Sequence, residues 1–200
     1  MPLFLMYCRF LKIMKNLFIV TLLAFATNLA YAQKNITLEA DGNLESPKPL
    51  LCVDLSEVTN EHNPADILHG MRKCIELKDY KNAASLFAIA GVYGRYDTYR
   101  VKDKSAHQAL LVLQQNVTLD LNEEDKKYLM EHIKELMEPS SLNAICQAIR
   151  KIGPPNYHPR YMIQHSITAF LENEDNGLNE IFDSEESWKL TLKNYLRCGE

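Results

Sequence analysis

The chain has 200 residues, 46% of them hydrophobic, and a net charge of −4 at neutral pH. This length and apolar content suit one globular domain with a substantial core, and they exclude a low-core scaffold that needs disulfides to fold at all. The acidic balance repels phosphate backbones, so we expect no nucleic-acid partner.

Residues 1–32 have the layout of a secretory signal peptide. A candidate true start at Met14 is followed by Lys15, an apolar run at residues 17–26 and the small-residue cleavage site Ala30-Tyr31-Ala32. We therefore expect a mature chain that begins at Gln33. No cysteine follows the cleavage site, so we expect no lipid attachment there.

The mature chain is expected in the periplasm or outside the cell. No segment after residue 32 is apolar for long enough to span a bilayer, so we expect no membrane span. Cleavage would remove three of the 22 basic residues and none of the 26 acidic ones, which changes the net charge to −7. The exported domain is thus predicted to be clearly acidic.

Four cysteines remain after the predicted cleavage, and an even number in an oxidising compartment predicts two disulfides. They are Cys52, Cys74, Cys146 and Cys198. Three connectivities are open. We favour Cys52 with Cys198, which would tie both ends of the domain together, and Cys74 with Cys146, which would join two helices. No C-x-x-C spacing and no histidine pair four residues apart occurs, so we expect no metal and no cofactor.

Residues 33–60 predict an extended arm that precedes a single helical domain at residues 61–200. The arm is polar, contains Asp41-Gly42 and Pro47-Lys48-Pro49, and gathers apolar residues only at residues 49–53. Helical signals begin at Asn63, a capping residue followed by Pro64. This first helix should end near Leu77.

Asp79 predicts the start of a second helix, which should end at Gly91 or Gly94. Residues 76–90 resemble the turn and second helix of a tetratricopeptide or Sel1-like hairpin at Tyr80, Ala83, Phe87 and Ala90. The resemblance implies two antiparallel helices that approach closely at the alanines. It covers one repeat of about 34 residues without the family's tryptophan and glycine, so it implies the hairpin and not a peptide-binding groove.

The rest of the chain predicts further helices with short connections. Their expected starts are Ser105, Asn122, Ser140 or Ser141, Pro159, and Asp183 or Ser184. Pro139 and Gly153 should end the helices before them, and the last helix should reach Cys198. No alternating apolar run predicts a strand. The fold class is therefore all-α, a compact bundle of six or seven helices with the hairpin near its start.

Two segments concentrate tyrosine and arginine. The candidate binding residues are Arg95, Tyr96, Asp97, Arg100, Tyr157, His158, Arg160 and Tyr161. Such side chains combine flat surface with directed hydrogen bonds and are typical of protein or glycan contacts. The structural alternative is that Asp97 pairs with Arg100, and that the prolines of residues 151–165 only stop one helix and start the next.

The sequence predicts a protein that binds another protein in the periplasm. An immunity or inhibitor protein against a toxin or wall hydrolase fits this reading, as does a tetratricopeptide-like adaptor. The whole pattern resembles secreted proteins of Gram-negative bacteria, a resemblance that implies no activity. The alternative function is a cell-wall enzyme, a glycosidase or amidase, but no catalytic motif occurs and we assign no catalytic residue.

Overall fold

The computed structural model describes residues 39–171 and 176–199. The predicted signal peptide and residues 33–38 of the predicted arm lie outside the described residues. The chain from Ala40 onward forms one compact unit. In its described part, no helix is both long enough and apolar enough to cross a membrane.

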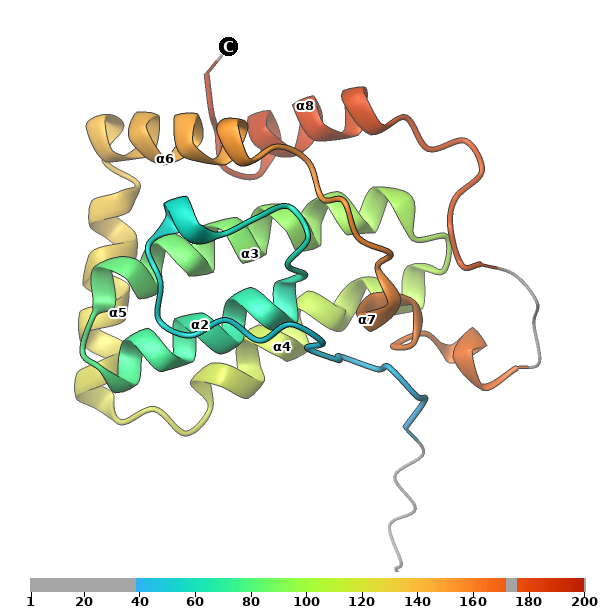
Figure 1. Cartoon of the computed structure of the whole chain (residues 1–200), viewed down its shortest axis with the longest axis horizontal. Helices are drawn as coiled ribbons and strands as arrows, with labels where there is room; N and C mark the ends of the chain where they lie inside the picture. Colours follow the sequence, from blue (N-terminus) through green and yellow to red (C-terminus); the bar gives the residue numbers. More distant parts are fainter. Residues whose placement is uncertain (1–38, 172–175, 200) are drawn as a thin grey trace, which may run out of the picture. The chain divides into compact units, whose positions relative to one another are not determined.

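The unit is built from helices joined by short connections (Figure 1). They are η1 (Leu55–Glu57), α2 (Pro64–Glu76), α3 (Tyr80–Arg100), η2 (Lys104–Gln108), α4 (Ala109–Thr118), α5 (Glu123–Leu136), α6 (Pro139–Ile152), α7 (Arg160–Ile163), η3 (Ile167–Phe170) and α8 (Ser184–Asn194). Within the two described ranges there is no strand, only an isolated bridge between Val101 and Leu178. The predicted all-α class is confirmed.

Helix α2 begins at the predicted cap. The Asn63 side chain accepts a hydrogen bond from the Asp66 amide at 2.9 Å, and the Asp66 carboxylate accepts one from the Asn63 amide at 3.0 Å. A reciprocal cap of this kind contributes about 1 kcal/mol. The helix is followed by Lys78 at a φ of 64°, a left-handed residue that closes the turn into α3.

Helix α3 is longer than the sequence predicts, because Gly91 and Gly94 lie inside it and do not end it. A Cβ atom at Gly91 would lie 2.2 Å from the Tyr195 hydroxyl, and one at Gly94 would lie 2.7 Å from the Leu110 side chain. Both glycines therefore serve close packing against distant segments. Residues 95–100, which lie beyond the predicted end, continue the helix.

The helices after α3 follow the predicted caps in part. Asn122 and Asp183 cap α5 and α8, and Gly153 ends α6 at a φ of 88°. The predicted helix from Pro159 to Phe170 is instead two short pieces, α7 and η3. The Ser166 side chain accepts a hydrogen bond from the Ala169 amide and starts a new helical turn there.

The core lies around α3, which runs antiparallel beside α2 and is covered by α5 and α8 (Figure 1). Its fully buried side chains are mostly large and apolar, and each contributes roughly 1.5–3 kcal/mol by leaving water. They include Ile67, Leu68 and Met71 of α2, Leu86, Ile89 and Tyr93 of α3, and Ile149 of α6. Ala83 and Ala90, two positions of the predicted hairpin, are also fully buried.

The four cysteines form two disulfides, but the pairing we favoured is wrong. Cys52 bonds to Cys74 with a Cα–Cα distance of 4.5 Å, and Cys146 bonds to Cys198 with a distance of 5.7 Å. Each bridge thus fastens an irregular segment to the helix that it packs on, α2 or α6. The two ends of the domain are held to separate helices and not to each other.

Residues 40–60, predicted as part of an extended arm, belong to the same compact unit as the helices. Asp66 of α2 holds much of this segment, because its carboxylate accepts hydrogen bonds from the Ser46 hydroxyl and the Lys48 amide, both at 2.8 Å. Leu44 donates to the Tyr161 carbonyl at 3.0 Å. Leu55 and Val58 are buried. The segment is therefore held to α2 and α7, and η1 at its far end packs on α3 and α6.

Candidate functional site

The structure brings the two tyrosine- and arginine-rich segments together around one buried carboxylate. We call Asp97, Arg100, Tyr157 and Tyr161 the Asp97 cluster. The Asp97 carboxylate accepts hydrogen bonds from the Tyr157 hydroxyl at 2.9 Å, from the Tyr161 hydroxyl at 2.7 Å and from Arg100 Nε at 2.7 Å. Helix α3 supplies the acid and the arginine, while Tyr157 precedes α7 and Tyr161 lies within it.

The charged side chains of the Asp97 cluster interact with other groups of the protein. The Arg100 guanidinium lies 4.8 Å from the Tyr157 ring and 5.5 Å from the Tyr96 ring, and its Nη1 donates to the Tyr157 carbonyl. Burial raises the pKa of Asp97, and the neighbouring Arg100 opposes that rise. Burial and the Asp97 carboxylate raise the pKa of both cluster tyrosines well above their usual value.

Several candidate binding residues are therefore inaccessible to a partner in this conformation. Tyr96, Asp97 and Tyr161 are 2%, 0% and 1% exposed. The exposed candidates are Arg95, His158 and Arg160, and Arg160 pairs with Asp41 and Glu45 of the N-terminal segment. The pairing of Asp97 with Arg100 matches the structural alternative for residues 91–100.

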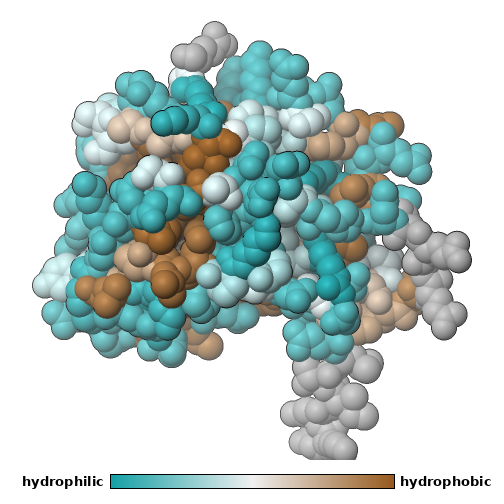
Figure 2. Space-filling model, in the orientation of Figure 1, coloured by the Kyte–Doolittle hydropathy of each residue, from teal (hydrophilic) through white to brown (hydrophobic). Residues whose placement is uncertain are grey.

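A concave, mostly apolar surface lies elsewhere, beside α6. We call it the α6 groove, and it encloses about 430 Å³. Its lining residues come from η1, α3, α5 and α6: Leu55, Lys81, Ser85, His132, Glu135, Leu136, Ser141, Ala144, Ile145 and Ala148. Figure 2 shows apolar side chains gathered among hydrophilic ones on the face that carries η1 in Figure 1.

The α6 wall of this groove carries small side chains, which leave space for a ligand. Ser141, Ala144 and Ala148 recur at three- and four-residue spacing on one face of α6. Ile145 lies on the same face and is 6% exposed, so it forms part of the apolar floor. An approaching backbone would meet methyl and hydroxyl groups here, with no long side chain to displace.

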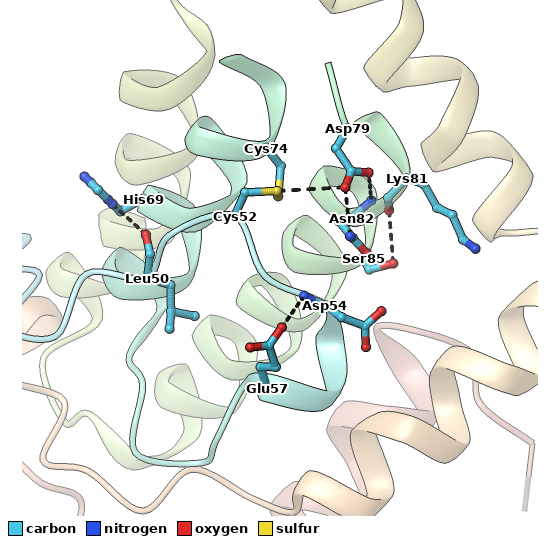
Figure 3. Close-up of a disulfide and its surroundings, with 10 residues drawn as sticks. All are labelled: Leu50, Cys52, Asp54, Glu57, His69, Cys74, Asp79, Lys81, Asn82 and Ser85. Carbon is cyan, nitrogen blue, oxygen red and sulfur yellow. Dashed lines mark hydrogen bonds between the residues drawn. A yellow bond between two sulfur atoms is a disulfide. The ribbon is translucent and has the colours of Figure 1, made fainter. Parts of the chain in front are cut away.

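The η1 wall of the groove, which contacts α3 and α6, is fixed by local hydrogen bonds and by a disulfide (Figure 3). Asp54 caps η1 by accepting from the Ser56 amide at 2.9 Å, and its own amide donates to Glu57 at 3.2 Å. The Cys52–Cys74 bond anchors the preceding residues to α2. Leu55 is thereby held in the groove, where η1 packs on α3 and α6.

Polar groups stand at the edge of the groove. Lys81 belongs to α3 and extends away from the disulfide (Figure 3), while His132 and Glu135 lie one turn apart on α5. The His132 ring packs against Tyr80 at 5.9 Å, and its Nδ1 is 2.9 Å from the Tyr128 carbonyl. These groups offer one cation, one carboxylate and one imidazole around an apolar floor.

Sequence reasoning missed the α6 groove, because its residues are ordinary constituents of amphipathic helices. The available signal was the run of small residues on one face of α6, which the periodicity of residues 141–148 contains. Small residues on a helix face indicate a groove only where neighbouring elements leave that face uncovered, and the positions of η1 and α5 cannot be derived from residues 141–148 alone.

Comparison with protein-family models, with curated proteins and with solved structures finds no match for this chain. The hairpin resemblance and the resemblance to secreted proteins of Gram-negative bacteria therefore stay predictions.

Proposed function

We propose that this chain is an exported protein that binds another protein, and that the partner inserts the apolar face of a helix into the α6 groove. The observation that carries the proposal is an open groove with an apolar floor and a wall of small side chains. Helix-in-groove binding uses this arrangement, in which a few apolar anchors provide most of the affinity.

The length of the concave surface supports a helix as the ligand. A second hollow of about 440 Å³ shares Leu55 and Ala148 with the α6 groove and continues along α6 to Lys151 and Ile152. The concave surface therefore follows α6 from Ser141 to Ile152, about three turns, which is long enough for anchors at positions i, i+3, i+4 and i+7 of a bound helix.

The rigidity of the η1 wall also supports binding. The disulfide and the cap of η1 restrict the movement of Leu55 before any partner arrives. A preorganised surface loses less conformational entropy on association. The charges of Lys81 and Glu135 at the edge would then select the orientation of the partner, since complementary charges fix register more than they add affinity.

The proposed location is the periplasm, and both an inhibitor of a toxin or wall hydrolase and an adaptor are consistent with the groove. The alternative of a cell-wall glycosidase is less well supported. That chemistry uses a pair of carboxyl groups across the scissile bond, whereas Glu135 is the single carboxylate in the lining of the α6 groove.

A matched pair of variants tests the proposal. Ala144 is exposed and lines the groove, whereas Gln147 is exposed on the same helix and does not. Ala144→Arg should fill the groove and weaken binding of the partner about 30-fold, equivalent to roughly 2 kcal/mol, whereas Gln147→Arg should bind as the parent does. The partner would be captured from periplasmic extract, purified and titrated by calorimetry. Equal affinities of the two variants, with unchanged helicity, would refute the proposal.

A further inference from the structure

A second groove lies between α6 and α8. We call it the α8 groove, and it encloses about 640 Å³. Its lining residues are Arg150, Glu185, Trp188, Lys189, Leu192, Lys193, Cys198 and Gly199. None of them lines the α6 groove, so the two surfaces can be tested separately.

The floor of the α8 groove is apolar and well supported. Trp188 and Leu192 lie one turn apart on α8 and face the groove. The half-buried Trp188 ring packs against Tyr93 at 6.2 Å and Tyr96 at 5.8 Å, which hold it from below. An apolar side chain of a ligand would therefore meet a flat aromatic surface that is already positioned.

The edge of the α8 groove is predominantly cationic. Lys189 and Lys193 stand one turn apart on α8, Arg150 faces them from α6, and Glu185 is the single acid in the lining. Among the residues that the structure describes, no carboxylate forms an ion pair with any of these three cations. Three cations that no described carboxylate neutralises thus gather around one hollow, in a chain whose net charge is −4.

The end of the groove is covalently fixed. Cys198 is bonded to Cys146 of α6, and its amide donates to the Leu192 carbonyl at 3.0 Å. The Arg150 guanidinium donates to the Gly199 carbonyl. The C-terminal segment thus forms a wall that need not be ordered by a ligand, which reduces the entropic cost of binding.

We propose that the α8 groove binds an acidic protein segment. An apolar side chain of that segment packs on Trp188 and Leu192, while its carboxylates pair with Lys189, Lys193 and Arg150. Charge complementarity selects this ligand, because cations without a carboxylate partner in the described part of the chain, set around an apolar floor, attract an anionic partner that also has an apolar group. The inference goes beyond the proposed function, since it concerns another surface and does not depend on the α6 groove.

The charge distribution favours a protein segment over an anionic membrane. Glu185 lines the same groove, and Asp183 and Glu186 lie on either side of it at the start of α8. A lipid surface would bring negative charge to all of these acids at once, whereas a folded or extended segment can place its carboxylates at the three cations alone. The concave form of the groove also suits a narrow ligand.

Trp188 makes the test direct, because it is the chain's single tryptophan. The probe is a short blocked peptide of glutamate with leucine at every third or fourth position, titrated against the full protein while Trp188 fluorescence is recorded. We expect a saturable change in the emission that weakens as salt is raised, since the pairs are solvent-accessible. The same peptide with lysine in place of glutamate should not bind.

Charge reversal in the groove distinguishes binding there from binding elsewhere. Lys189→Glu with Lys193→Glu should weaken the glutamate peptide at least about tenfold and should bind the lysine peptide instead. Lys134→Glu, an exposed lysine of α5 outside the lining of either groove, should behave as the parent does. Circular dichroism before each titration confirms that all variants are folded.

The contrary outcomes are equally clear. No response of Trp188 to the glutamate peptide, or equal binding by the Lys189/Lys193 and Lys134 variants, would overturn the proposal. A response to vesicles of phosphatidylglycerol and phosphatidylcholine, without one to the peptide, would also overturn it and assign the groove to a lipid surface. Binding of the protein partner through the α6 groove would be unaffected by each of these results.

Discussion

The Asp97 cluster and the α6 groove differ in where their polar side chains find partners. In the Asp97 cluster, two tyrosine hydroxyls and an arginine converge on one buried carboxylate, so their hydrogen bonds are made inside the protein. In the α6 groove, the side chains of Lys81 and Glu135 are exposed at the edge of an open hollow. A concentration of tyrosine and arginine thus indicates a place where segments are joined as readily as a place where a partner binds.

The Asp97 cluster and the η1 wall of the α6 groove are also made rigid in different ways. The Asp97 cluster links the end of α3 to residues 157–161 through buried polar contacts, which are costly to disrupt. The η1 wall of the α6 groove depends on a disulfide and a cap near the surface. The first should dominate the stability of the fold, and the second should control the shape of the binding surface.

The largest expected effect tests the structural role of the Asp97 cluster. Asp97→Ala leaves the Arg100 charge buried without its carboxylate and should lower the free energy of unfolding by about 3–5 kcal/mol. Urea denaturation followed by circular dichroism measures it. The control is Asp41→Ala, whose surface pair with Arg160 should contribute little. Equal stability of the two variants would contradict a structural role for the cluster.

A smaller effect should separate the two regions. Replacing both Cys52 and Cys74 by serine removes a cross-link between residues 22 apart and should lower the free energy of unfolding by about 3 kcal/mol in the chain-entropy model. Because the Asp97 cluster does not include this segment, the folded variant should keep its helicity while it binds the α6-groove partner more weakly. Unchanged affinity would show that the η1 wall is not part of the binding surface.

These outcomes bear on what the sequence could predict. Caps such as Asn63 and Gly153 were predictable because their contacts lie within a few residues of the helix end. The end of α3 was not, because Gly91 is retained for its contact with Tyr195, a residue more than a hundred positions away. The same limit applies to the disulfides, whose pairing depends on which helix each loose segment packs against.

The candidate site shows that limit most clearly. The sequence located Asp97, Arg100, Tyr157 and Tyr161 as chemically distinctive but not their common burial, because the two segments are about 60 residues apart. The α6 groove was not predicted at all. Ala144 and Ala148 have no distinctive chemistry, and only the placement of η1 and α5 leaves their face open.

The smallest effect is expected at Asp125, which forms an ion pair with Lys78. The Asp125 side chain is 9% exposed and the Lys78 side chain is 59% exposed, so the pair is neither buried like the Asp97 cluster nor fully open like the edge of the α6 groove. Hydrogen bonds from Lys78 and Tyr80 lower the pKa of Asp125 below its ordinary value of 3.8. A lowered folded-state pKa adds stability above pH 4 that is lost as the pH falls through that pKa. Asp125→Asn should flatten the fall in melting temperature below pH 4, and an unchanged acid limb would contradict this assignment.

Site-specific photo-crosslinking shows whether the partner contacts the α6 groove, as we propose, or the tyrosine- and arginine-rich loop. A photoreactive residue would be placed at Ala144 in the groove or at His158 in the loop, both of which are exposed. After illumination of each variant in the presence of the purified partner, we expect a covalent complex from position 144 and none from position 158. A complex formed from position 158 alone would contradict the account and return the interface to the loop.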